Sequence, residues 1–123
     1  MFNTARQFGK QSESLAVRYL EKNGYVILER NYRIREGEID IIAKDGDTIV
    51  FIEVKARRSG KFGNPKWAVT PGKQKKISLT ALHYLKATNR SNAKARFDVV
   101  TIRSEKNSSD MEIIKNAFEF ACG

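Results

Sequence analysis

Apolar and polar residues recur with two different periods along this chain, and these periods predict its elements. From about Thr4 to Asn23 the apolar residues return at helical spacing, and Asn23-Gly24 supplies a stop signal. A second helix is expected to begin at Pro71, because Thr70 followed by Pro71 is a favourable N-cap and first helical position, and to run to about Ala87. The side chains that we expect this helix to bury are Ile77, Ala81, Leu82 and Leu85.

Runs of β-branched and aromatic residues predict five strands, with a short helix as the alternative for the last one. They cover residues 25–34, 38–44, 48–57, 95–103 and 111–120, while 58–67 is predicted to be a loop. Asp45-Gly46 is a hairpin signal, and with these two residues as the turn Asp40 would pair with Phe51 and Glu38 with Glu53. The order α-β-β-β-α-β-β predicts an α/β fold with a central mixed sheet flanked by helices.

The predicted hairpin carries ionisable residues inside strands that otherwise consist of core residues. Because strand side chains alternate between faces, Glu38, Asp40, Glu53 and Lys55 are expected on one face. Asp40 and Glu53 would be diagonal neighbours, ~7–8 Å apart at the backbone, so one divalent cation would fit between their carboxylates.

Charged residues in a strand usually mark a solvated face, and this interpretation competes with a functional site. Ile49 to Ile52 show almost no polar alternation, which indicates that both faces are largely buried. Buried carboxylates are unfavourable unless they are paired or bound to a metal. An ion pair between Glu53 and Lys55 would satisfy one carboxylate but would leave Asp40 unexplained. The pattern therefore favours a site.

The composition narrows the class of partner. The 123 residues predict a single domain over 1–123, and 41% apolar with 30% charged residues is ordinary for a folded protein. The net charge of +9 is not ordinary and favours a polyanionic partner, nucleic acid more often than an acidic membrane.

No apolar run approaches the ~20 residues that span a bilayer. The single cysteine, Cys122, excludes an internal disulfide and suits a reducing cytoplasm.

Paired carboxylates with a nearby lysine suit phosphodiester chemistry. Mg²⁺ prefers oxygen ligands, commonly one or two carboxylates with water and phosphate. A metal held in this way stabilises the charge that develops on phosphate and makes bound water more nucleophilic. Lys55, two residues beyond Glu53, would point into the same site. There it could orient or deprotonate the attacking water, or neutralise the scissile phosphate.

At these residues the sequence resembles the PD-(D/E)xK nuclease superfamily, in which an Asp on one strand precedes (D/E)xK on the next. A closer resemblance, to the YraN family of small bacterial proteins related to archaeal Holliday-junction resolvases, covers nearly the whole chain. It is carried by Gly9, Glu13, Ala16, Tyr19-Leu20, Gly24-Tyr25, Asn31, GEIDII, FIEVKAR, Phe62-Gly63 and residues 96–100.

The resemblance implies a restriction-endonuclease-like core and a set of roles. Asp40 and Glu53 would be metal ligands, Lys55 the catalytic lysine, and Glu13 an additional acidic residue at the metal. Spacing also places Glu13 on the helical face of Ala16, although a solvated glutamate is an even alternative. The superfamily's proline before the Asp is missing, since Ile39 stands there.

Further candidates surround this predicted centre. Glu38 is expected at the rim, where it would hydrogen-bond rather than coordinate. The candidate nucleic-acid contacts are Arg57, Arg58, Lys61, Lys66, Lys73, Gln74, Lys75 and Lys76. Any one of the seven basic residues taken alone is better explained as an ordinary surface charge, and Gln74 could simply be solvated. Asp98 is expected to form an ion pair with Arg96 or to contact a helix, and no role is assigned to His83.

These patterns together predict a DNA endonuclease that depends on Mg²⁺ or Mn²⁺ and acts on branched or single-stranded DNA in repair or recombination. A non-catalytic DNA- or RNA-binding module of the same fold is the first alternative, and an interaction protein with a polar pocket is the second. An enzyme that cuts two strands would suit a homodimer.

Overall fold

The computed structural model describes residues 5–57, 69–105 and 108–121, so the predicted loop 58–67 lies outside the described residues. The described residues form an α/β fold with a five-stranded mixed sheet and two flanking helices, as predicted. The last strand is confirmed and its helical alternative is wrong. The elements are α1 (Ala5–Lys22), β1 (Val26–Ile34), β2 (Gly37–Asp45), β3 (Thr48–Arg57), α2 (Pro71–Ala87), β4 (Lys94–Glu105) and β5 (Ser108–Phe118).

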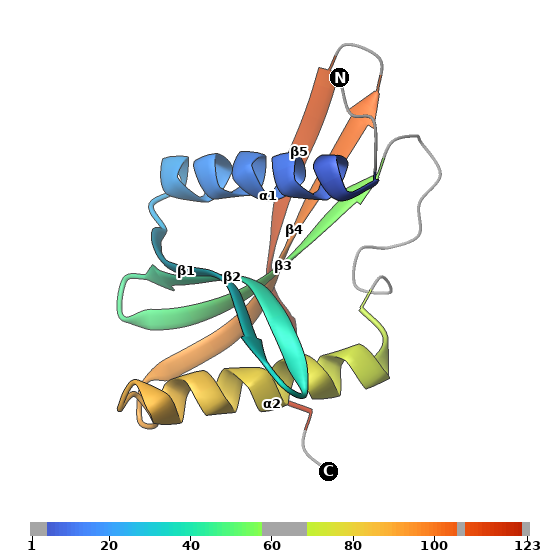
Figure 1. The fold of residues 1–123 in the computed structure, drawn as a ribbon. Coiled ribbons are helices and arrows are strands. Elements are labelled where there is room, and N and C mark those ends of the chain that lie inside the picture. Colours follow the sequence, from blue (N-terminus) through green and yellow to red (C-terminus); the bar gives the residue numbers. More distant parts are fainter. Residues whose placement is uncertain (1–4, 58–68, 106–107, 122–123) are drawn as a thin grey trace.

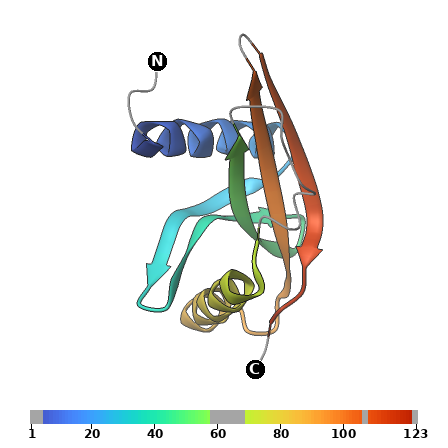
Figure 2. The same ribbon diagram turned by 90° about the vertical axis from the view of Figure 1, so that its right-hand side faces the viewer.

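The strands follow one another across the sheet in chain order, β1-β2-β3-β4-β5. Only β3 and β4 are parallel, and α2 lies in the connection between them. The two helices lie on either side of the sheet (Figures 1 and 2). This arrangement is consistent with a restriction-endonuclease-like core. Neither helix in the described part of the chain is long and apolar enough to cross a membrane.

Each face of the sheet has its own apolar core, which explains why the central strands lack polar alternation. Phe51 and Phe97 pack with residues of α2 on one side. Ile52 and Val100 pack with residues of α1 on the other. Leu82 was predicted to be buried but is 47% exposed. The buried face of α2 follows Ile77, Ala81 and Leu85 at intervals of four residues, and Leu82 projects to one side of it.

The β2–β3 turn differs from the prediction by one residue in each strand. Asp45 pairs with Thr48, so Gly46 and Asp47 form the turn, and Phe51 pairs with Ile42 rather than with Asp40. Gly46 has a φ of +62°, which suits the first central position of a type II′ hairpin turn. A change of one residue in each strand leaves paired side chains on their predicted faces. The site residues therefore stay together.

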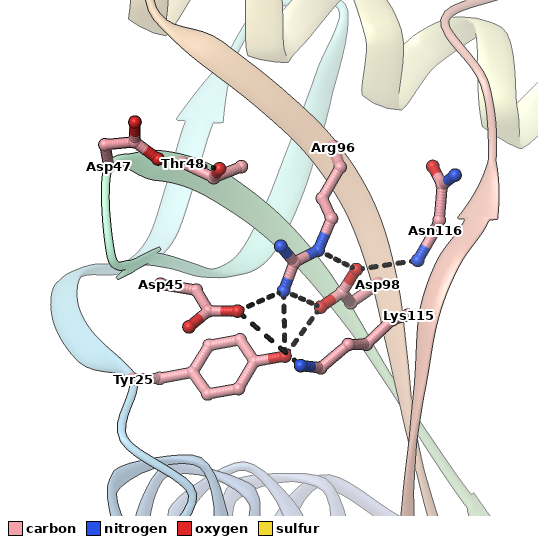
Figure 3. Close-up of polar contacts among 8 residues, drawn as sticks. All are labelled: Tyr25, Asp45, Asp47, Thr48, Arg96, Asp98, Lys115 and Asn116. Carbon is pink, nitrogen blue, oxygen red and sulfur yellow. Dashed lines mark hydrogen bonds and ion pairs between the residues drawn. The ribbon is translucent and has the colours of Figure 1, made fainter.

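A buried polar network holds the turn end of this hairpin to the rest of the sheet (Figure 3). Asp98 is fully buried and accepts hydrogen bonds from the Tyr25 hydroxyl, Arg96 Nε and the Asn116 backbone N–H, each at 2.9 Å. Arg96 Nη2 also donates to Asp45 at 2.7 Å. Burial, and then the hydrogen bond to Asp98, raises the pKa of Tyr25 to about 12. The predicted Asp98–Arg96 ion pair is confirmed, and its other partners were missed.

Candidate functional site

A pocket of about 440 Å³ lies at the opposite end of the β2–β3 pair from this network. The β1–β2 hairpin reaches α2 in this region (Figure 1). The lining residues come from β2, β3 and the segment that begins α2: Gly37, Glu38, Asp40, Glu53, Thr70, Gly72, Lys73, Lys76 and Ile77. Three carboxylates and two lysines therefore meet around one cavity of a size typical for ligand sites.

Asp40 lies where β2 separates from β3. The last backbone pair between the strands is Ile41 with Ile52, and beyond it Asp40 Oδ2 accepts a hydrogen bond from the Val54 backbone N–H at 2.9 Å. The carboxylate thus takes the place of a neighbouring strand's carbonyl. If the observed register is extended by one pair, Asp40 lies directly opposite Glu53. In the predicted register the two residues were diagonal neighbours.

Glu53 lies in the central strand β3 and is only 5% exposed. The Nζ atom of Lys73 forms an ion pair with Glu53 Oε2, and Lys55 Nζ lies 3.9 Å from the same oxygen. The start of α2 positions Lys73, because the Thr70 side chain caps the helix by accepting from the Lys73 backbone N–H at 3.2 Å. Two ammonium groups from different elements thus approach one buried carboxylate.

The electrostatics of the pocket are those of two crowded carboxylates. Burial, followed by the charge of Glu53, raises the pKa of Asp40 to about 7, while the Val54 N–H acts in the opposite direction. The charge of Glu13 also contributes to the increase. Burial lowers the pKa of Lys73, but the hydrogen bond and charge of Glu53 outweigh it, so this pKa is raised. The pocket stabilises added positive charge.

Asp40 and Glu53 have the chemistry to hold a divalent cation. Their oxygens are the ligands that Mg²⁺ prefers. The pKa of Asp40 is raised first by burial and then by the charge of Glu53, and a cation would relieve this repulsion. Among the described residues, no three Asp, Glu, His or Cys side chains are arranged to hold one metal between them. Water and phosphate would then have to fill the coordination positions that the two carboxylates leave open. Glu13 as an additional ligand stays a prediction.

The structure brings some of the other predicted residues to the pocket. Glu38 lines it and forms an ion pair with Arg33 at 3.2 Å, which suits its predicted place at the rim. Lys76 lines it as well, from the exposed side of α2. Lys55 is half-buried beside Glu53.

Other predicted contacts do not line the pocket or cannot be placed. Gln74 donates from its side-chain Nε2 to the Val69 carbonyl at 2.9 Å, and Gln74 is not among the residues that line the pocket. Its amide therefore ties the first turn of α2 to the residue before the N-cap. Lys75 is exposed and is not among the lining residues. The other four predicted contacts cannot be located, because Arg58, Lys61, Lys66 and the side chain of Arg57 lie outside the described residues.

Sequence reasoning missed the close approach of the hairpin to α2. A Cβ atom at Gly37 would lie 2.8 Å from Thr80 Oγ1 and 3.1 Å from the Lys76 carbonyl, so only glycine fits there without a shift. The glycine next to Glu38 was the available signal. His83 also has a partner that was not foreseen, since its Nδ1 lies 2.8 Å from the Tyr32 hydroxyl.

The fold and the pocket define the class: an α/β protein with a restriction-endonuclease-like core and an acidic pocket where its central hairpin opens. Residues 12–102 match "Uncharacterised protein family UPF0102". The chain belongs to this family, which is the YraN family that its sequence resembles.

Bacterial relatives support the same assignment. The UPF0102 protein of Desulfosudis oleivorans is 51% identical over 119 residues, which cover 97% of this chain and 95% of the relative. The UPF0102 protein of Syntrophus aciditrophicus is 55% identical over 115 residues, or 94% and 91% of the two chains. That of Geobacter metallireducens is 53% identical over 116 residues, or 94% and 95%.

Proposed function

We propose that this protein binds nucleic acid and hydrolyses phosphodiester bonds of DNA with Mg²⁺ or Mn²⁺. The observation that carries the proposal is the pocket in which Asp40 and the buried Glu53 meet Lys73 and Lys76, in a chain of net charge +9. Acidic ligands beside basic side chains suit a cation and a phosphate at adjoining positions.

Each residue has a proposed part in the reaction. A bound divalent cation would stabilise negative charge on the phosphate oxygens and acidify water. Asp40 and Glu53 hold the cation, with Glu13 assisting from α1. Lys55 orients the attacking water, whose oxygen forms a bond to phosphorus as the bond to the leaving sugar oxygen breaks. The water's proton passes to solvent, and the leaving oxygen takes a proton from solvent.

Lys73 and Lys76 would contact the phosphate backbone from the first turns of α2. Arg57, the last residue of β3, is proposed to extend this contact together with the basic residues that follow it in sequence, Arg58, Lys61 and Lys66. The proposed substrate is branched or single-stranded DNA in repair or recombination. Phosphate contacts read no base sequence, so these residues are assigned no part in a sequence preference. A reducing cytoplasm is the proposed compartment, since the chain has a single cysteine.

Cleavage of end-labelled linear duplex, single-stranded and four-way-junction DNA tests this proposal, with Mg²⁺ or Mn²⁺ present. We expect cleavage by the parent and its loss in Glu53→Gln, because a neutral amide is a poor ligand for a hard cation. Asp47→Asn makes the same charge change at the far turn and should cut like the parent. Cleavage by Glu53→Gln at the parent's rate would refute the assignment.

A non-catalytic nucleic-acid-binding module is a second candidate, favoured by the ion pair of Lys73 with Glu53. In such a module the lysine would neutralise the carboxylate permanently. DNA or RNA binding that weakens with salt, and that persists in Glu53→Gln without cleavage by either protein, would select this candidate.

A homodimer is proposed only for a substrate in which two strands are cut, because a symmetric pair of chains provides two equivalent centres. Light scattering after gel filtration, with and without junction DNA, measures the number of chains. One chain per junction would exclude the dimer.

A further inference from the structure

Lys73 contacts the atom that a metal ion would need. Its Nζ forms an ion pair with Glu53 Oε2, the carboxylate oxygen from which Lys55 Nζ is 3.9 Å away. Glu53 and Asp40 line the same pocket as Lys73. The ammonium of Lys73 would therefore compete for one position with a cation that these two carboxylates coordinate.

The competition has a simple electrostatic basis. A buried carboxylate needs a counter-ion, and in this structure Lys73 provides one for Glu53. A divalent cation at the same oxygen would strongly repel an ammonium group a few ångströms away, because water screens charges poorly in a half-buried pocket. The divalent cation and the Lys73 ammonium cannot both bind Glu53 strongly, so binding of the metal requires Lys73 to move.

Lys73 is free to make this movement. It lies in the first turn of α2, and its side chain is 46% exposed although its amino group contacts a buried partner. Lysine has a long flexible stem, so the ammonium can leave Glu53 without a change in the backbone. Lys76, one turn further along α2, also lines the pocket, and a phosphate near Lys76 would offer Lys73 a new partner.

We propose that Lys73 is an exchangeable counter-ion of Glu53, displaced when a divalent cation binds and held away by a phosphate group of the nucleic acid. The inference rests on the proposed function, which supplies the cation and the phosphate. Lys73 weakens cation binding in the free protein, and nucleic acid relieves this effect. Cation and nucleic acid therefore bind cooperatively, and the coupling is reciprocal.

The inference is tested by titrating the full chain with Mn²⁺. Isothermal calorimetry and the paramagnetic resonance of free Mn²⁺ monitor the binding. Lys73→Gln is compared with Lys75→Gln, which removes the same charge from an exposed position outside the pocket. We expect Lys73→Gln to bind Mn²⁺ at least about tenfold more tightly than the parent, since it lacks the competing charge. Lys75→Gln should stay within about twofold of the parent because its distant charge is screened.

A short single-stranded DNA added to the same titrations tests the coupling. In the parent the DNA should strengthen Mn²⁺ binding clearly. In Lys73→Gln the gain should be smaller, because no lysine remains to be drawn from Glu53. Lys73→Arg retains a cation and should retain the weak binding of the parent. Circular dichroism of each variant confirms that it is folded before titration.

The outcomes separate the inference from the proposed function. Equal Mn²⁺ affinity in Lys73→Gln and Lys75→Gln, or weaker binding in Lys73→Gln, would overturn the inference and leave the metal site standing. Absence of Mn²⁺ binding in all variants would remove the metal site, and the proposed catalytic function would fall together with the inference. Binding by Lys73→Gln alone would support the inference, with Lys73 acting as a complete block.

Discussion

The negative charge of Asp40 should destabilise the metal-free protein at neutral and alkaline pH. Burial and the neighbouring Glu53 raise the pKa of Asp40 from 3.8 to about 7. Between about pH 4 and pH 7 the folded chain therefore retains a proton that the unfolded chain has released. The free energy of unfolding falls as the pH rises through this window and reaches its low plateau above about pH 7.

The pKa difference sets the size of this effect. About three pH units at 1.36 kcal/mol each give about 4 kcal/mol. This is an upper bound, because the Lys73 side chain, which is 46% exposed, can shift toward an ionised Asp40 and lower the cost of its charge. About one of these three units is already lost at pH 5, so we expect the parent to lose about 1–3 kcal/mol of stability between pH 5 and pH 8.

Urea unfolding followed by far-ultraviolet circular dichroism, with EDTA present, measures this loss. Asp40→Asn should lose much less stability over the same pH range, since its amide cannot ionise while its oxygen can still accept from the Val54 N–H. Asp47→Asn is the matched control, because Asp47 is 78% exposed and its ion pair with Lys94 is on the surface. Mn²⁺ in place of EDTA should reduce the loss in the parent by neutralising the ionised pair.

Two results would refute this reasoning. If the parent is equally stable at pH 5 and pH 8, the carboxylates do not carry the excess charge that we assign to them. If Asp40→Asn and Asp47→Asn show the same pH dependence as the parent, the effect belongs to other groups.

Three further substitutions test the fold around the site by urea unfolding. Asp98→Asn should destabilise the protein by about 3–5 kcal/mol, because it leaves Arg96 without its buried partner; a loss below about 1 kcal/mol would contradict the structural role of the network. Gly37→Ala should destabilise by about 1–3 kcal/mol, since the new Cβ would meet Thr80 at 2.8 Å, and unchanged stability would show that the hairpin can move away from α2. Thr70→Ala should destabilise by about 1 kcal/mol through loss of the N-cap, and an unchanged midpoint would mean that the cap contributes nothing.

Local features of the chain were sufficient for several parts of this structure. The alternation of side chains placed Asp40, Glu53 and Lys55 on one face, and this placement holds although the register differs from the prediction. Thr70 and Pro71 marked the start of α2 correctly. These features depend on neighbours a few residues apart, so a pattern in the sequence is enough to predict them.

Contacts between distant segments were decided only by the tertiary structure. Eight residues were candidates for nucleic-acid contact, and the fold brings Lys73 onto Glu53 while Gln74, the next residue, turns to Val69. Packing likewise decided that Asp98 meets Tyr25, which is 73 residues away in the chain. The sequence by itself determined which side chains share a face of a strand or a helix, because backbone geometry repeats over short intervals. The pairing of those faces depended on how helices and strands far apart in sequence pack together.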